Sequence, residues 1–269
     1  MFEPNSYGFR PGRSIQDAIE AIFNHLRLKL KYVLDADIEK CFDRIDRSAL
    51  LAKLHVPRLV RRLIQGWLDA WVLDDGEWLY PEAGTPQGGV ISPWLANIAL
   101  PGLEIAVSTH TRQHPVVVIR YADDLVILCD DVDTLKAAQG IAAEWRATMG
   151  LQFKASKTRI GHTLDQSEGQ TGFDFLGFNI RQFRVSPYRS HRRQAGYKTL
   201  IKPSAKSIQR HLDRIKDIVR AHRGAPQAAL IAELNPVIRG WAMNYGSTAP
   251  HVSGVCRQRD IPPARPLGV

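Results

Sequence analysis

Hydrophobic positions recur along the chain at helical and strand-like spacings, and the changes between them mark successive elements. Apolar residues follow a helical spacing from Ser14 to Leu30, and Ser14 with Asp17 resembles a capping box. The pattern predicts short strands at 32–38, 116–120 and 125–129, with the last two joined by a tight hairpin turn. It predicts helices near 47–54, 57–71 and 93–110, and a second hairpin around 74–84.

The composition of the chain becomes strongly basic after about residue 185. Before that point, we expect Asp133 to cap a helix that Gly150 ends. Residues 181–223 then hold thirteen Lys and Arg but two acidic residues. Two helices are predicted here, at 204–220 and 226–245, and the apolar stripe expected to face inward in the first is Ile208, Leu212, Ile215 and Val219.

These patterns predict an α+β domain over 1–185 followed by a basic helical module over 186–250. The tail, residues 251–269, carries three prolines and scattered charge, and we expect it to be poorly ordered.

Charge narrows the class of partner. The 269 residues include 36 Lys and Arg against 27 Asp and Glu, a formal net charge of +9. This balance favours a polyanionic partner, above all nucleic acid. The three cysteines are far apart, which argues against a disulfide framework and fits a reducing compartment. No run of about twenty apolar residues exists, so no membrane partner is expected, and the first residues lack a signal-peptide layout.

Acidic residues at the ends of apolar strands carry the candidate chemistry. Asp37 closes one predicted strand, and Asp123 with Asp124 lies in the turn between two others. Buried carboxylates are costly unless they are paired or bound to metal. Three converging carboxylates without His or Cys suit Mg²⁺, which prefers oxygen ligands. The alternative interpretation is that these residues cap strand ends and pair with nearby arginines.

Six sequence blocks, taken in order, resemble the reverse transcriptase/maturase proteins encoded by group II introns. The third and fourth blocks are the specific ones, and the similarity extends from Met1 to about Gly246. The blocks are Tyr7–Ser14, Asp37-Ile38 with Cys41-Phe42-Asp43, Gly84–Gly89 with Ser92-Pro93, Tyr121-Ala122-Asp123-Asp124, Lys157-Thr158, and Phe175-Leu176-Gly177-Phe178.

The resemblance implies a right-hand polymerase palm, an antiparallel sheet with helices, joined to partial fingers and an α-helical thumb that runs into the maturase domain. It makes Asp37, Asp123 and Asp124 the catalytic carboxylates. Asp37 and Asp123 would be the principal ligands of two Mg²⁺ ions, with Ile38 beside them, Asp124 in support and Mn²⁺ as a possible substitute. Two such ions activate the attacking 3′ hydroxyl and stabilise the leaving pyrophosphate.

The same resemblance implies a set of nucleotide- and template-binding residues. Phe42 would be an aromatic gate against the ribose 2′ hydroxyl, although it could also be ordinary core. Lys157 could reach the triphosphate or stay solvated, and Arg10 could contact template or pair with an acidic residue. The remaining members of the set are Gln87, Gly88, Gly89 and Ala122, where a bare Gly-Gly turn is the alternative for the glycines.

Further positions are assigned to the primer side and the thumb. Phe175, Leu176 and Gly177 would border the primer strand, and their apolar side chains are expected to be core as well. The basic helical module would track a phosphate backbone. Trp241 and Tyr245 lie four residues apart, a spacing that is more typical of core than of a base-stacking platform.

The function implied is RNA-directed DNA polymerisation with assistance to intron splicing. The partners would be an RNA template, intron RNA, a DNA primer or target and dNTPs, in a bacterial cytoplasm or an organelle. Finger sequence that precedes the first block in the family is absent here, so a second polypeptide could supply it. The alternatives are a catalytically silent RNA-binding splicing cofactor and a non-functional fragment of a mobile element. Retron-like reverse transcriptases share the Asp-Asp turn, but 84–93 and 235–245 favour the group II class.

Overall fold

The structure is a computed structural model of the chain, and its compact part divides into two units. It describes residues 2–27, 29–74, 76–79, 83–85, 89–110, 114–167, 170–185 and 196–246. The first unit is Met1–Phe173 and the second is Asp174–Val269. The division falls before residue 185, so the hairpin of the second unit belongs with the helices that follow it. The assignment of palm function to 1–185 and of thumb function to 186–250 stays a prediction.

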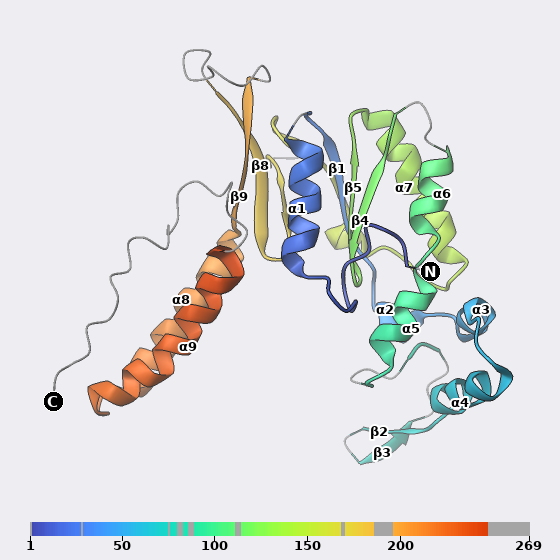
Figure 1. Cartoon of the computed structure of the whole chain (residues 1–269), viewed down its shortest axis with the longest axis horizontal. Helices are drawn as coiled ribbons and strands as arrows, with labels where there is room; N and C mark the ends of the chain where they lie inside the picture. Colours follow the sequence, from blue (N-terminus) through green and yellow to red (C-terminus); the bar gives the residue numbers. More distant parts are fainter. Residues whose placement is uncertain are drawn as a thin grey trace. The chain divides into compact units, whose positions relative to one another are not determined.

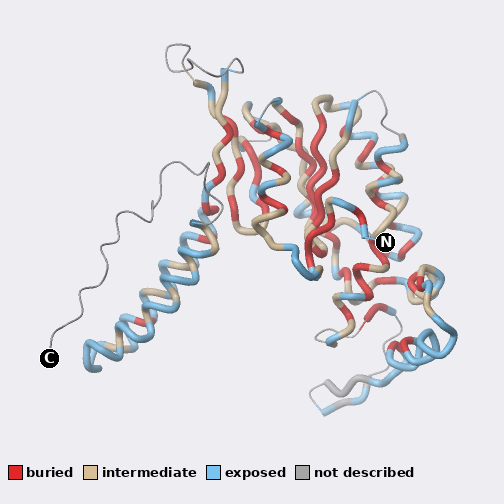
Figure 2. Tube along the Cα trace, in the orientation of Figure 1, coloured by how far each residue is buried: buried red, intermediate tan, exposed pale blue. Residues whose placement is uncertain are grey.

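An antiparallel four-stranded sheet forms the centre of the first unit (Figure 1). Its strands are β1 (Tyr32–Asp37), β4 (Val117–Tyr121), β5 (Asp124–Cys129) and β6 (Arg159–His162), in the order β4-β5-β1-β6. The central strands are largely buried, as Figure 2 shows. Both faces of the sheet are therefore covered, and its apolar strands read as nearly continuous hydrophobic runs.

Helices cover the two faces because side chains alternate along each strand. Leu34 and Ile127 face α6 (Leu103–His110) and α7 (Val132–Ala147), where they join one apolar cluster. The next residues along the strands, Val33 and Leu128, are also fully buried and face the other side. The helix α1 (Ile15–Leu26) packs against β4 and begins with the predicted Ser14–Asp17 capping box.

Short helices form a second layer at the end of the sheet where β1 stops. They are α2 (Cys41–Arg44), α3 (Arg47–Lys53), α4 (Arg58–Leu68) and α5 (Ser92–Ala99). Ile38, Ile45, Leu50 and Leu95 are among the residues that hold this layer together. The predicted hairpin near 74–84 is present as β2 (Val72–Asp74) and β3 (Glu77–Leu79). A 3₁₀ turn, η1 (Ala155–Lys157), precedes β6.

Two helix boundaries differ from the prediction. The continuous helix expected over 93–110 is two helices, α5 and α6, because Pro101 and Gly102 interrupt it and Gly102 has a φ of +110°. The helix expected to be capped by Asp133 is capped by Asp131, whose carboxylate accepts from the amide of Thr134 at 2.7 Å. Both residues are aspartates two positions apart, so composition alone does not distinguish them.

The second unit combines a three-stranded sheet with a pair of helices. The strands are β7 (Phe173–Phe175), β8 (Phe178–Arg184) and β9 (Tyr197–Pro203), with β8 and β9 antiparallel. The helices are α8 (Ala205–Ala221) and α9 (Gln227–Gly246), close to their predicted bounds. Ser204 caps α8. The predicted disordered tail, 251–269, lies outside the described residues.

The apolar stripe predicted for the first basic helix is not the face that α8 buries. The side chains of Ile208, Leu212 and Val219 are 41%, 52% and 44% exposed. The buried residues of α8 are Ser207 and Ile218. The prediction that the stripe lies inside is therefore wrong for Ile208, Leu212 and Val219, whereas Ile215 is half-buried. Within those residues, no helix is both long and apolar enough to cross a membrane.

Candidate active site

Three carboxylates meet where the central strands end. In the register of β1 and β5, the last residue of β1, Asp37, is directly opposite Asp124. Tyr121 pairs with Asp124 across β4 and β5, so Ala122 and Asp123 are the two central residues of a tight hairpin turn. The carbonyl of Asp123 accepts from the amide of Ile38 at 3.3 Å, which joins this turn to the end of β1. The strand register therefore brings Asp37, Asp123 and Asp124 to the same end of the sheet.

The hairpin turn is shaped by unusual backbone geometry. Ala122 has a φ of +56°, in the left-handed region that side chains other than glycine rarely adopt. Gly8, in the first sequence block, lies directly against this turn. A Cβ atom at Gly8 would stand 2.3 Å from the nitrogen of Ala122. The absence of a side chain at Gly8 is therefore what lets the first block support the turn that carries Asp123 and Asp124.

Burial and mutual repulsion raise the proton affinity of the turn carboxylates. Burial is the largest cause for Asp124, followed by the charges of Asp123 and Asp37, and together they raise its pKa to about 6. Burial also raises the pKa of Asp123, with a further contribution from Asp37. The thiol of Cys41 is buried near the same charges, and its pKa rises to about 12. This neutral thiol contributes no negative charge to the site.

Lys157 provides the cation that faces these carboxylates. Its ammonium group donates to Oδ2 of Asp37, and this hydrogen bond raises the pKa of Lys157. The segment before it is held to β1, because the amide of Lys154 donates to the carbonyl of Asp37 at 2.9 Å. Since the Lys157 side chain is 57% exposed, it faces the solvent side of the site, as a triphosphate-binding residue must.

Phe42 lies beside the site, and the segment that begins the third block holds its backbone. The amide of Thr85 donates to the carbonyl of Phe42 at 2.6 Å, and Gly84 lies so close that a Cβ there would be 2.4 Å from the same oxygen. The ring of Phe42 is partly buried against the apolar cluster of the short helices α2–α5. It also contacts the ring of Phe9 edge-on, with centroids 6.1 Å apart. The structure thus agrees with a core role, and the role of Phe42 as a gate stays a prediction.

The other nucleotide- and template-binding predictions have different outcomes. Gln87 and Gly88 lie outside the described residues. Gly89 is described, and its carbonyl accepts from the amide of Ser92 at 3.1 Å. Arg10 donates to the carbonyls of Glu3 and Ser6 at 2.9 and 2.6 Å, so it braces its own loop and makes no ion pair within the described part of the chain. Its predicted contact with template stays a prediction.

The block assigned to the primer side lies in the second unit and packs within it. Phe175 is buried, and Leu176 and Gly177 have φ values of +50° and +83°. A Cβ at Gly177 would stand 2.8 Å from the Tyr245 hydroxyl. Tyr245 also contacts Trp241, with ring centroids 4.9 Å apart. Both aromatic residues are engaged inside their unit, which favours the core interpretation.

The donor chemistry of the site fits a hard divalent cation. Among the described residues, no three Asp, Glu, His or Cys side chains are already arranged as a metal-binding group. The three carboxylates nevertheless offer oxygen donors alone, and their mutual repulsion raises the pKa of Asp124. Ile38 could contribute only its carbonyl oxygen, because its side chain is apolar and 2% exposed. A cation that replaced the Lys157 ammonium beside Asp37 would relieve the repulsion.

Sequence reasoning missed one charged residue of this site. Arg120 stands in β4 just before the turn, is 2% exposed, and donates to the carbonyl of Ala122 at 3.3 Å. The signal was present in the sequence, because a lone arginine interrupts the apolar run that ends at Tyr121. An arginine in a strand buried on both faces needs internal partners, and such partners are seldom incidental.

Comparison with known families assigns most of the chain. Residues 1–180 match the family model described as reverse transcriptase, RNA-dependent DNA polymerase. Residues 208–253 match the model described as the maturase-specific domain of group II introns. The two matches divide the chain into the same two parts that the charge distribution indicates.

Individual relatives agree with these families and are longer than this chain. The group II intron-encoded protein LtrA of Lactococcus lactis subsp. cremoris is 36% identical over 107 residues, 39% of this chain and 18% of its own length. Protein YkfC of Escherichia coli is 28% identical over 225 residues, 66% of this chain and 55% of its own. An uncharacterized 91 kDa protein in the cob intron of Schizosaccharomyces pombe is 38% identical over 108 residues, 39% of this chain and 13% of its own.

A solved structure supports the fold. The apo telomerase of Candida tropicalis, truncated from its C-terminal domain, superposes with a TM-score of 0.52 at 17% identity. The match covers 66% of this chain and 39% of the telomerase chain. It confirms the predicted α+β fold of a reverse transcriptase palm.

Proposed function

The chain belongs to the reverse transcriptase family, and from that premise we propose that it is an RNA-directed DNA polymerase of the group II intron type. It would add nucleotides to a primer 3′ end on an RNA template. The observation that carries the proposal is the position of Asp37 opposite Asp124, with Asp123 in the turn between them. Nucleotidyl transfer by two metal ions requires carboxylate ligands placed together in this way.

We propose Mg²⁺ as the cofactor, in two ions held by Asp37 and Asp123 with support from Asp124 and the Ile38 carbonyl. When bound, such ions supply charge stabilisation for both the attacking and the leaving oxygen. The chain contributes the fixed carboxylates, whose positions are set by paired strands rather than by loops. Ligands held by strands need little movement to reach their reactive positions. This favours a reaction that depends on precise orientation of the reacting groups.

The neighbouring residues have separable roles in this proposal. Lys157 would exchange its contact with Asp37 for the triphosphate of the incoming dNTP, since its ammonium is half-exposed beside the carboxylates. Phe42 would crowd a ribose 2′ hydroxyl from the opposite wall. Gln87, Gly88, Gly89, Ala122 and Arg10 would line the nucleotide and template, and Phe175, Leu176 and Gly177 the primer.

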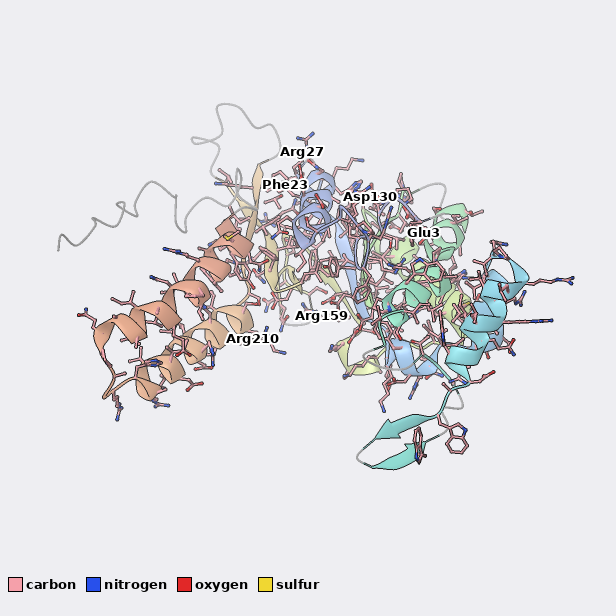
Figure 3. All side chains as sticks on the ribbon, turned by 60° about the horizontal axis from the view of Figure 1, so that its bottom comes forward. Glu3, Phe23, Arg27, Asp130, Arg159 and Arg210 are labelled. Atoms are coloured by element: carbon pink, nitrogen blue, oxygen red, sulfur yellow. The ribbon has the colours of Figure 1, made fainter. Side chains whose placement is uncertain are left out.

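Nucleic acid is the partner that the second unit favours. The helix α8 presents the basic side chains of Lys206, Arg210, Arg214, Lys216 and Arg220, with Arg210 labelled in Figure 3. We propose that this helix tracks the phosphate backbone of the template–primer duplex or of intron RNA. The group II maturase-specific match over 208–253 supports the intron RNA as one such partner.

Primer extension on poly(rA)/oligo(dT) with Mg²⁺ tests the proposal, and the matched comparison is between two aspartates. Asp123→Ala should abolish extension, whereas Asp133→Ala should leave it unchanged because that carboxylate is 87% exposed on α7. RNA binding should be the same in all three proteins. Extension that survives Asp123→Ala would contradict the proposal.

A catalytically silent RNA-binding cofactor is the second candidate. It is favoured by one observation, namely the match of residues 208–253 to the maturase-specific domain of group II introns. Salt-sensitive RNA binding without any extension would support it.

A further inference from the structure

A buried polar network stands behind the hairpin turn that carries Asp123 and Asp124. Its centre is the guanidinium group of Arg120 in β4. One terminal nitrogen of Arg120 donates to the hydroxyl of Ser6 at 2.7 Å. The other donates to the carbonyl of Ala122 at 3.3 Å and to the side-chain oxygen of Asn97 at 3.4 Å. Arg120, Ser6 and Asn97 are each at most 2% exposed.

The network joins three segments that are distant in sequence. Asn97 lies in α5, and its amide nitrogen donates to the carbonyls of Gly8 and Phe9 at 2.8 and 3.3 Å. Ser6 lies in the N-terminal segment, which also pairs with the backbone of Arg120 on both sides. The amide of Tyr7 donates to the carbonyl of Arg120, and the amide of Arg120 donates to the carbonyl of Asn5, both at 2.9 Å.

The N-terminal segment is itself fixed at a second point. Glu3, labelled in Figure 3, accepts from the amides of Gly102 and Glu104 at 2.7 and 3.0 Å, where α6 begins. The segment is therefore anchored on α6 at one end and on the hairpin turn at the other. Gly8 completes this second contact by lying against Ala122 without a side chain between them.

None of the hydrogen-bond acceptors of the Arg120 guanidinium described above is a carboxylate, although Glu3 and Glu104 lie near enough to favour its charge. Among the described residues, Arg120 forms no ion pair, and its Nε has no hydrogen-bond partner. Burial also lowers its pKa. A buried charge without an ion-pair partner is unfavourable, and an apolar side chain at this position would avoid that cost. Packing alone does not explain an arginine at this position.

The acceptor that matters is the carbonyl of Ala122. This carbonyl and the amide of Asp123 belong to one planar peptide unit, so holding the oxygen fixes the plane from which the Asp123 side chain leaves. The φ of +56° at Ala122 is unfavourable for alanine and persists only where surrounding contacts impose it. Arg120 provides one such contact through its hydrogen bond to the Ala122 carbonyl. Gly8 permits a second contact, because its backbone lies directly against the Ala122 nitrogen.

We propose that Arg120, through Asn97 and Ser6, is a positioning residue that holds the Ala122–Asp123 peptide in its metal-binding orientation. This inference rests on the proposed function. Arginine is required because its planar fork reaches three acceptors at once, whereas lysine is a point charge on a flexible stem. Arg120 does not face solvent or substrate, so it acts through Asp123 rather than on the reaction.

The test measures metal affinity directly, with Mn²⁺ as the probe and its electron paramagnetic resonance signal as the readout of free ion. Arg120→Lys should weaken Mn²⁺ binding roughly ten- to hundredfold, the usual effect of removing an outer-shell support. Ser6→Ala removes one acceptor from the network with little change in volume. It should weaken Mn²⁺ binding by a smaller factor while leaving the protein folded.

Arg146→Lys is the matched control, because Arg146 is also a fully buried arginine of the first unit and its Nε donates to Ala142 in its own helix. It should lower the melting temperature without changing Mn²⁺ affinity. Unchanged Mn²⁺ affinity in both Arg120→Lys and Ser6→Ala, or equal losses in Arg120→Lys and Arg146→Lys, would overturn the positioning role.

The same titration separates this inference from the proposed function. A wild-type chain that bound no Mn²⁺ would contradict the metal site, and the positioning role would fall with it. A wild-type chain that bound Mn²⁺ and extended primers, with variants that did the same, would contradict the positioning role alone.

Discussion

At the scale of single residues, Asp124 shows how the fold places a carboxylate where its ionised form is unfavourable. It is placed opposite Asp37 by strand register and beside Asp123 by the turn, and burial removes the water that would screen all three. Burial and the two neighbouring charges together raise the pKa of Asp124 to about 6. The carboxyl therefore holds a proton more tightly in the folded chain than in the unfolded one. Under the proposed function, a bound cation would relieve the repulsion among these carboxylates.

Stability should therefore fall as the pH rises through the range where Asp124 ionises. The folded pKa of Asp124 lies above its ordinary value of 3.8, so its stabilising effect is complete below about pH 4 and is lost as the pH passes about 6. The loss should be on the order of 3 kcal/mol of unfolding free energy. Urea unfolding across this range measures it.

Two comparisons isolate the source of this pH dependence. Asp124→Asn should flatten the change between about pH 4 and 6, because the amide does not ionise. Mg²⁺ should restore stability to the wild type above about pH 6, because it binds the ionised carboxylates of the folded state. A wild-type curve that rose over this range, or that matched Asp124→Asn, would contradict the assignment.

At the scale of elements, the tight hairpin between β4 and β5 depends on the segment that lies against it. The N-terminal segment approaches so closely that a Cβ at Gly8 would stand 2.3 Å from the Ala122 nitrogen. This contact is with backbone, which cannot move aside as a flexible side chain can. The first sequence block therefore supports the catalytic turn in addition to any contact it makes with template.

Gly8→Ala should destabilise the first unit by about 1–3 kcal/mol, the usual cost of overpacking. The matched substitution is Gly66→Ala in α4, where nothing lies within 4 Å of the new Cβ. Because alanine favours a helix interior, that variant should gain about 0.5–1 kcal/mol. Thermal unfolding of the two variants compares them, and a Gly8→Ala protein as stable as wild type would refute the close contact.

The elements also show what the sequence could and could not predict. The end of β1 at Asp37, the two-residue hairpin turn and the Ser14–Asp17 cap were predictable because each depends on neighbouring residues. The exposed stripe of Ile208, Leu212 and Val219 was not, since burial depends on which helix packs where. Arg120 was overlooked for a related reason: two of its three acceptors, Asn97 and Ser6, come from segments far from it in the chain.

At the scale of the whole molecule, a net charge of +9 sits on a chain whose acidic residues include the proposed metal ligands. The excess of basic residues lies in the second unit, whose helix α8 carries five Lys and Arg against two Asp. Electrostatic attraction to the phosphate backbone is independent of the nucleotide sequence, and it weakens as the salt concentration rises. Affinity for nucleic acid and catalysis should therefore depend on different parts of the chain.

Lys206→Gln with Arg210→Gln should reduce the salt dependence of duplex binding. Each lost phosphate contact lowers the slope of log affinity against log salt by about 1, so the double variant should lose about 2. Fluorescence anisotropy at several salt concentrations gives the slope. Lys136→Gln with Arg61→Gln changes the same charge on exposed helices of the first unit and should leave the slope near wild type. Equal slopes in both double variants would contradict the assignment of α8.

The most direct test of the central claim is single-nucleotide incorporation by wild type and Asp123→Asn at increasing Mg²⁺, with EDTA as the zero point. Asparagine keeps the size of the side chain and its place in the turn but removes the charge that a metal needs. The account predicts Mg²⁺-dependent incorporation by the wild type, none in EDTA, and loss of nearly all incorporation in the variant although it still binds duplex. Incorporation by Asp123→Asn at the wild-type rate, or by the wild type in EDTA, would contradict the claim that these carboxylates form a metal-dependent polymerase site.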